Sequence, residues 1–225
     1  MHKRGVNLMQ KSLYSLILSD SVISKIDMLA LKQGTNRSNM INMILADYVS
    51  LTTPEMHIEN VFRQMEQMLS VYDNIVPIMI PNRATMSVKS TLEYKYRPTV
   101  KYDIHLYRNI QNGAFGELSV SFRTQSESLI SLTEEFFKFW CRLENAYIQR
   151  AFKNDIRYYY TDGKFVRTLM CADDASTTPE ALADGISSYV RVLDDIMKGT
   201  VSGRYSLSDS EEKYVSYLKN SKLMV

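Results

Sequence analysis

The sequence predicts an α+β protein, with a small N-terminal unit of one strand and two helices ahead of a larger domain that contains both strands and helices. Three observations support this class. A β-type stretch of about seven residues within 11–22 stands alone before two helical repeats, apolar and polar residues alternate between 86 and 122, and longer segments carry apolar residues at three-four spacing. We therefore predict domains at 1–52 and 83–225, joined by a connecting helix and linker at 53–82.

The two N-terminal helices are predicted from their apolar spacing and their end signals. The first should run from about Asp20 to Gln33, because Gly34 can take the left-handed conformation that ends a helix. Ser38 is the expected cap of the second helix, and Pro54 closes the segment. The supporting apolar positions are Val22, Ile26, Leu29 and Ala30 in the first helix and Ile41, Ile44, Leu45 and Tyr48 in the second.

One strand and two helices cannot form a stable monomer. The strand has no partner for its backbone hydrogen bonds, and two amphipathic helices leave an open apolar face. Pairing the strand with the same strand of a second chain removes both problems. We therefore expect a homodimer in which each chain supplies one strand, and the pairing of dimers into tetramers stays open.

The N-terminal segment resembles a known family. The stretch "YSLILSDSVISKIDMLALKQGTNRSNMINMILADY" is similar to the ribbon-helix-helix (Arc/MetJ-type) family of bacterial DNA-binding proteins, over residues 11 to about 50. The likeness rests on the strand ending in Leu-Ser-Asp, the pattern of the first helix, the break at Gly34 and the "GTNRSNMI" that opens the second helix. It implies an antiparallel two-stranded ribbon in the major groove of double-stranded DNA.

The resemblance and the alternation of strand side chains together give a candidate DNA interface. If Tyr14, Leu16 and Leu18 point into the dimer core, the opposite face of the strand meets base edges. The expected base-contacting residues are Lys11, Leu13, Ser15 and Ile17, and the expected phosphate-contacting residues are Lys3, Arg4, Asn36, Arg37 and Ser38. The family usually has polar or basic residues on the outward face, whereas Leu13 and Ile17 are apolar. Contacts to thymine methyl groups, DNA shape or the basic arm could replace the missing polar contacts.

A register shifted by one residue would place Ser12, Tyr14 and Leu16 outward, which is no more polar, so we keep the first register. The charge distribution also favours the N-terminal end as the DNA-binding part. Residues 1–50 carry six Lys and Arg against three Asp, a net charge of +3, whereas the rest carries 21 against 22, a net −1. A dimer would double the positive end.

The larger domain is predicted to contain a three-stranded antiparallel meander and a hairpin. Strands are expected at 86–97 and 99–108, with a third strand that carries Leu118, Val120 and Phe122, and Asp162-Gly163 is a strong turn signal in "RYYYTDGKFVRTL". Arg157, Lys164 and Arg167 with the tyrosines of this hairpin could form a second nucleic-acid surface, although an ordinary hairpin with a charged edge fits better.

Helices should cover the sheet. The connecting helix carries Ile58, Val61, Phe62, Met65 and Leu69 on one side, and an aromatic stripe predicts a long helix from about Ser126 to Phe152. A third helix is capped by Thr178-Pro179-Glu180 and stops near Gly199, and a fourth opens at Ser208 with Glu211 completing a capping box.

Composition and motifs exclude several classes of protein. With 45% hydrophobic and 23% charged residues the chain is typical of a folded soluble protein, and it has no run of eighteen apolar residues and no signal peptide, so we expect a cytoplasmic, nucleoid-associated location and no membrane partner. Cys141 and Cys171, alone or with His105, match no zinc or disulfide spacing. There are three histidines and no GxSxG, Walker, GxGxxG or HExxH motif, so we predict neither an enzyme nor a cofactor nor a metal.

These observations favour a homodimeric, sequence-specific transcriptional regulator that binds double-stranded DNA, and whether it acts as a repressor or an activator stays open. Its C-terminal domain would sense a small effector, oligomerise or recruit a protein partner. One alternative is an accessory or inhibitory interaction module that uses the ribbon only to dimerise. An antitoxin-type autorepressor is the other alternative, but the folded C-terminal extension argues against it, because such antitoxins usually end in a short disordered tail.

Overall fold

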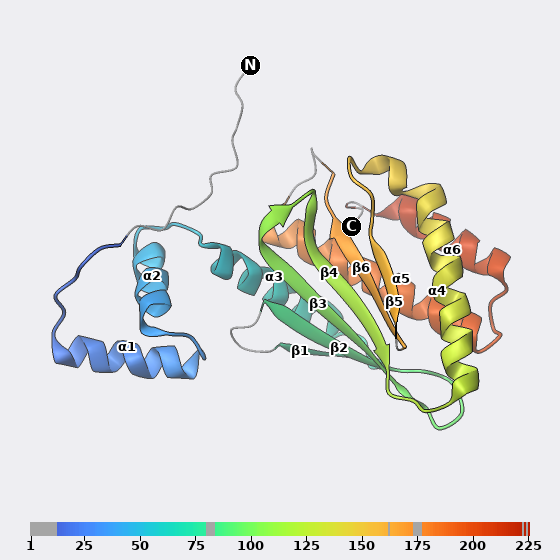
Figure 1. Cartoon of the computed structure of the whole chain (residues 1–225), viewed down its shortest axis with the longest axis horizontal. Helices are drawn as coiled ribbons and strands as arrows, with labels where there is room; N and C mark the ends of the chain where they lie inside the picture. The colour runs from blue at the N-terminus through green and yellow to red at the C-terminus, as the bar shows by residue number, and fades with distance from the viewer. Residues whose placement is uncertain (1–12, 80–83, 162, 173–176, 222, 224) are drawn as a thin grey trace, which may run out of the picture. The chain divides into compact units, whose positions relative to one another are not determined.

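The structure is a computed structural model that describes residues 13–79, 84–161, 163–172, 177–221, 223 and 225. The chain divides into two compact units, residues 1–53 and 54–225, which we call the first and second units (Figure 1). The helices and strands form an α+β arrangement, as the sequence predicts.

The first unit contains α1 (Asp20–Lys32) and α2 (Arg37–Tyr48). α1 ends where Gly34 takes a positive φ of 57°, a conformation in which glycine is favoured because it has no Cβ. The predicted cap of α2 is wrong by two residues. Asn36 rather than Ser38 is the N-cap, since its side-chain Oδ1 accepts the backbone N–H of Asn39 at 2.9 Å.

The core of the first unit is small. Ile26 and Ala30 of α1 and Met40 of α2 are buried together, and three partly buried side chains pack against them, Leu18, Ile41 and Met43. Several of the residues that the helical spacing placed inward are instead exposed in the single chain: Val22, Leu29, Ile44, Leu45 and Tyr48. The two helices therefore share few apolar contacts with each other.

Within the described residues of the second unit, six strands form one antiparallel sheet of order β1-β2-β3-β4-β6-β5. The strands are β1 (Ile75–Met79), β2 (Thr85–Thr91), β3 (Thr99–Gln111), β4 (Ala114–Phe122), β5 (Tyr158–Thr161) and β6 (Lys164–Met170). The hairpin of β5 and β6 extends this sheet, because β6 pairs with β4.

The helices of the second unit are α3 (Pro54–Leu69), α4 (Glu127–Tyr147), α5 (Pro179–Val201) and α6 (Leu207–Asn220), with a short 3-10 turn at Gln149–Ala151. α3 and α5 pack together behind the sheet as drawn in Figure 1, and α4 packs against α5 and β5. α5 begins at the predicted Thr178 cap. The predicted capping box of α6 is wrong, because Ser206 and Asp209 form it in place of Ser208 and Glu211.

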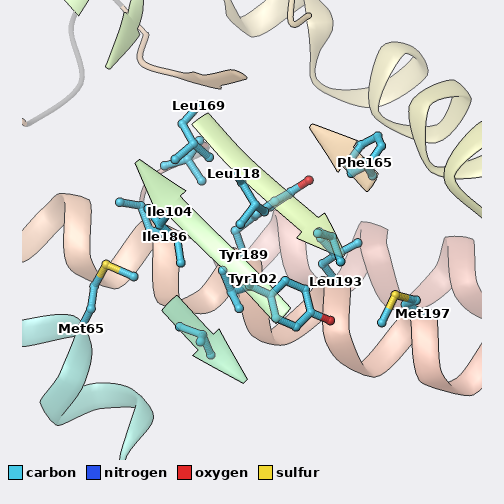
Figure 2. Close-up of a cluster of buried hydrophobic side chains, with 14 of the residues drawn as sticks. Met65, Tyr102, Ile104, Leu118, Phe165, Leu169, Ile186, Tyr189, Leu193 and Met197 are labelled. Carbon is cyan, nitrogen blue, oxygen red and sulfur yellow. The ribbon is translucent and has the colours of Figure 1, made fainter. Parts of the chain in front are cut away.

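The core of the second unit lies between the sheet and these helices. Figure 2 shows Tyr102 and Ile104 of β3 and Leu118 of β4 facing Ile186 and Leu193 of α5. These are alternate positions on the strands, so one face of the sheet is buried by apolar side chains. α3 contributes Ile58, Val61, Phe62, Met65 and Leu69 to the same core, so it belongs to the second unit rather than to a separate connecting segment.

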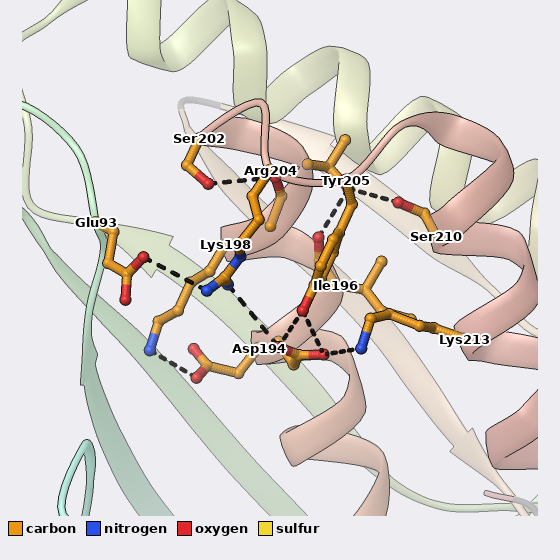
Figure 3. A network of polar contacts seen from close by, with 12 residues as sticks. Glu93, Asp194, Ile196, Lys198, Ser202, Arg204, Tyr205, Ser210 and Lys213 are labelled. Atoms are coloured by element: carbon orange, nitrogen blue, oxygen red, sulfur yellow. Dashed lines mark hydrogen bonds and ion pairs between the residues drawn. The ribbon is translucent and has the colours of Figure 1, made fainter.

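A buried ion pair anchors α5 to the sheet. Lys198 Nζ lies 2.7 Å from Asp194 Oδ2, with both side chains almost completely buried (Figure 3). Tyr102 of β3 donates to Asp194 Oδ1 at 2.8 Å, and Ser90 of β2 donates to Asp194 Oδ2 at 3.1 Å. Burial, together with the adjacent Asp194 carboxylate, raises the pKa of Tyr102 well above its ordinary value. The pair thus joins α5 to two strands through charge-assisted hydrogen bonds.

Two parts of the sheet differ from the sequence prediction. β1 was not predicted, and β2 ends at Thr91 rather than at 97. Residues 92–98 form a loop because Tyr96 and Arg97 take positive φ angles of 64° and 43°, which a strand cannot contain. Tyr96, predicted to face inward, is fully exposed. None of the described helices is long and apolar enough to span a membrane.

Candidate nucleic-acid interface

The segment ahead of α1 is extended and has no strand partner within the described residues. Leu13 is 99% exposed, Ile17 is fully exposed and Ser15 is also exposed. On the opposite side of the chain Leu18 packs against the small core of the first unit, whereas Leu16 remains largely exposed. The predicted outward residues are therefore free to contact a ligand, and an apolar strip remains beside them.

The start of α2 brings three of the predicted phosphate-contacting residues together. Asn36 caps the helix, and Arg37 and Ser38 are the first two residues of its first turn, all three of them exposed. The first backbone N–H groups of a helix have no partner within it and carry a partial positive charge. This end of α2 therefore offers N–H donors and a cation to an anion, and the side-chain oxygen of Asn36 is already used in capping.

Arg37 is held by a carboxylate in the single chain. Its Nε donates to Asp27 Oδ1 at 2.8 Å and its Nη2 to Asp27 Oδ2 at 2.7 Å, a bidentate pair that links α2 to α1. The hydrogen bond from Arg37 lowers the pKa of Asp27, and the same bond raises the pKa of Arg37. Asp27 was not predicted as a partner of Arg37, because the pairing depends on the angle between the two helices.

The positive charge of the first unit comes from its first twelve residues. Lys3, Arg4 and Lys11 of the predicted interface lie outside the described residues. Among residues 13–53 three cations (Lys25, Lys32 and Arg37) balance three carboxylates (Asp20, Asp27 and Asp47), a net charge of zero. Any net positive charge that this unit offers to an anion therefore comes from residues 1–12 and from Arg37 when it is released from Asp27.

Large apolar side chains remain exposed on the helices of the first unit. Besides the five that the helical spacing placed inward, they include Met28, Leu31, Val49 and Leu51. Isolated exposed apolar residues are normal, but this number in about forty residues is high for a unit with so small a core. Such a surface is suited to burial against a matching surface of another chain.

The prediction of a second nucleic-acid surface on the β5–β6 hairpin is wrong for one of its three cations. Arg167 is completely buried, and its Nε lies 2.8 Å from Oε2 of the equally buried Glu144. Burial is the largest single effect and would lower the pKa of Arg167, but the Glu144 carboxylate together with Tyr189 and Tyr158 outweighs it, so the pKa is raised. Arg157 and Lys164 line two separate depressions of 570 Å³ and 330 Å³. The hairpin therefore presents no cluster of three cations.

Within the described part of the chain, no three His, Cys, Asp or Glu side chains come together as a group that could hold a metal ion. Comparison of the chain with protein-family models, with curated proteins and with solved structures gives no match.

Proposed function

We propose that this chain is a homodimeric, sequence-specific regulator that binds double-stranded DNA through its first unit. In the dimer, residues 11–18 of two chains pair as an antiparallel ribbon, and the ribbon enters the major groove. The observation that carries the proposal is an extended, exposed and unpaired segment directly before a two-helix unit whose helices bury only four apolar residues.

The physical reason for the dimer is the balance of buried and exposed apolar surface. A unit of about forty residues rarely folds alone, because it buries too small a fraction of its surface. Each large apolar side chain that a second copy covers contributes about 1.5–3 kcal/mol. Pairing of the ribbon would also satisfy the backbone N–H and C=O groups of residues 11–18, which otherwise depend on water.

The DNA contacts follow from the same arrangement. Lys11 and Ser15 would supply hydrogen bonds to base edges, and Leu13 and Ile17 would contact thymine methyl groups. Asn36, Arg37 and Ser38 at the start of α2 would contact phosphate, with Lys3 and Arg4 as a basic arm. Arg37 would either replace its bond to Asp27 with a bond to a phosphate oxygen or bind both acceptors at once. The carboxylate and the phosphate therefore compete for one guanidinium.

The first experiment selects bound duplexes from a random pool with the full chain. A dimer should enrich two related half-sites in a symmetric arrangement. Arg37→Ala should weaken binding to the selected duplex at all salt concentrations. It should also reduce the slope of log affinity against log salt by about two, because a dimer loses two phosphate contacts. The matched control is Arg63→Ala, which removes an exposed arginine that pairs with Glu59 at 2.8 Å in the second unit.

The dimer itself is tested by sedimentation equilibrium. Leu16→Asp places a charge on the predicted inner face of the ribbon and should shift the full chain towards monomer. Leu207→Asp is the control, because Leu207 is 53% exposed on α6 and Leu16 is 59% exposed. Equal behaviour of both variants and the unchanged chain would contradict ribbon pairing.

The full exposure of Leu13 and Ile17 favours a second candidate function. An outward face with two aliphatic side chains also suits a protein partner, in which case the first unit dimerises an interaction module. This candidate predicts a stable dimer, no enriched duplex motif and no salt-dependent duplex affinity that Arg37→Ala weakens. The duplex selection, with its Arg37→Ala variant, therefore separates the two functions, whereas the dimer is common to both.

A further inference from the structure

A cavity of about 970 Å³ opens in the second unit between two loops. One wall is the 92–98 loop that joins β2 to β3, and the other is the segment from the end of β4 to the first turn of α4. Lining residues include Tyr94, Lys95, Tyr96, Arg123, Ser126 and Ser128. The volume falls within the range of small-molecule sites in proteins.

The charge of this cavity is positive. Lys95 and Arg123 are both exposed, and within the described part of the chain neither forms an ion pair. The lining contains no Asp or Glu. The nearest acidic residue along the loop, Glu93, is directed towards Arg204, with 3.7 Å between Oε2 and Nη1 (Figure 3). Two cations without a carboxylate among them favour an anionic ligand.

Neutral hydrogen-bonding groups lie beside the two cations. Ser126 caps α4, and its Oγ lies 2.9 Å from Ser128 Oγ. The hydroxyl of Tyr94 is 3.5 Å from the same Ser128 oxygen. A hydroxyl can donate as well as accept, so these groups can turn towards an anion. α4 begins at this wall, and its first backbone N–H groups carry a partial positive charge; Glu127 in the same turn is exposed and does not line the cavity.

Tyr96 adds an aromatic surface. Its side chain is 100% exposed, and it contributes nothing to the core of the second unit. Its backbone φ of 64° lies in the left-handed region, which is unfavourable for a residue with a Cβ. A free tyrosine face next to two cations is suited to stacking on an aromatic ring whose attached anion reaches the cations.

We propose that this cavity binds a nucleotide, with its phosphate on Lys95 and Arg123 and its base against Tyr96. The proposal is independent of duplex binding by the first unit. A ligand of this kind is either a free mononucleotide or one nucleotide within a single strand. Both offer a planar aromatic base and a phosphate on one small ligand.

Calorimetric titration of the full chain with ADP, with inorganic phosphate and with a thymidine tetranucleotide tests this site. The double variant Lys95→Gln/Arg123→Gln should weaken the binding of ADP or of the tetranucleotide at least tenfold and flatten its salt dependence. Arg142→Gln removes a cation from the exposed surface of α4 and should leave the affinity unchanged. Tyr96→Ala should weaken binding, and Tyr96→Phe, which keeps the ring, should restore it.

Stronger binding of ADP would identify a free nucleotide as the ligand, and stronger binding of the tetranucleotide would identify a single strand. The proposal is overturned if neither binds, or if the double variant binds as well as the unchanged chain. It is also overturned if phosphate binds as tightly as ADP and Tyr96→Ala has no effect. Unchanged emission of the buried Trp140 shows that each variant is folded. Arg37→Ala should leave ADP binding intact, so this result and the duplex result can be interpreted separately.

Discussion

Removing one partner of the buried Arg167–Glu144 pair should destabilise the second unit strongly. Both side chains have 0% exposure, and Arg167 Nε donates to Glu144 Oε2 at 2.8 Å. Arg167 also donates from Nη2 to the backbone oxygen of Val225 at 2.6 Å, and Tyr189 donates its hydroxyl to Glu144 Oε1 at 2.8 Å. Arg167→Met keeps the volume of the side chain but leaves Glu144 with the tyrosine hydroxyl as its one remaining donor among these contacts.

The size of the effect follows from the charge that remains. An isolated buried carboxylate takes up a proton, and protonating an ordinary glutamate at pH 7 costs about 3.5 kcal/mol, since each pH unit adds about 1.4 kcal/mol. The lost hydrogen bonds to buried acceptors add about 1–2 kcal/mol. We therefore expect Arg167→Met to lower the free energy of unfolding by about 4.5–5.5 kcal/mol at pH 7, at the upper end of the loss that is usual for a broken buried pair.

The protonation of Glu144 also determines how the stability of Arg167→Met depends on pH. In Arg167→Met the folded state binds one proton more than the unfolded state between pH 7 and pH 5, so the stability of the variant should rise as the pH falls. The gain relative to the unchanged chain should approach about 2.5 kcal/mol over those two units. Arg167→Met/Glu144→Leu has no carboxylate at this position, so it should recover most of the loss and show no such gain.

Urea unfolding measured by tryptophan emission gives these free energies. Trp140 is the one tryptophan of the chain, it is completely buried, and its Nε1 donates to the Tyr189 hydroxyl at 2.9 Å, so its emission reports on this network. A loss below about 1 kcal/mol at pH 7 for Arg167→Met, with no gain at pH 5, would refute the reasoning, because it would require that water reaches Glu144 in the folded unit.

Three further outcomes are expected. Asp27→Ala frees Arg37 for phosphate and removes a negative charge, so it should raise duplex affinity several-fold in a mobility-shift titration, and an unchanged affinity would count against competition between the two acceptors. In Gly199→Ala the new Cβ would lie 1.9 Å from the ring of Tyr205, so urea unfolding should show a loss of about 1–3 kcal/mol, and an unchanged midpoint would contradict this packing. Burial raises the pKa of the Cys141 thiol to about 12, so the folded chain should resist alkylation of Cys141 by iodoacetamide at pH 8, as measured by mass spectrometry, and rapid labelling would contradict that burial.

Sequence reasoning succeeded where one residue type decides the local structure. α1 was predicted to within about a residue at both ends, because Asp20 and Gly34 are end signals of known geometry. It was wrong about the cap of α2, where Asn36 and Ser38 are both good cap residues and the chain uses the earlier one. The 92–98 loop was missed because alternation continues through Tyr94 and Tyr96 while the backbone has already left the strand.

β1 was missed for a reason that lies in the sheet topology. This segment was predicted as part of the linker at 53–82, and it contains Pro77, a residue with no N–H to donate to a neighbouring strand. β1 is an edge strand with one neighbour, β2, so an absent donor on its open side costs nothing. The position of a strand in the sheet decides whether proline is tolerated, and the local sequence does not contain that position.

At the candidate site, the exposure of the residues was predicted better from the sequence than their contacts were. Strand alternation alone would have placed Arg167 inward with Phe165 and Leu169, because the three residues share one face of β6. The bond between Arg37 and Asp27 was not predictable, because it joins residues ten positions apart on two different helices. Contacts of this kind depend on the packing angle of the helices, and the sequence of a single chain does not define that angle.

The two units differ in how far each can stabilise itself, and this difference has a consequence for DNA binding. The second unit has a large core of its own, whereas the described part of the first buries only four apolar residues, three of them in one cluster. If a second copy supplies the missing contacts, ordering of the first unit and dimerisation are one equilibrium, and its position depends on protein concentration. Below the concentration at which the dimer dissociates, the fraction of duplex bound should then vary with the square of protein concentration. The emission of Trp140 in the second unit should stay constant over the same range. A first-power dependence through that range would mean that each chain folds its first unit alone, and the ribbon would then have no physical reason to form.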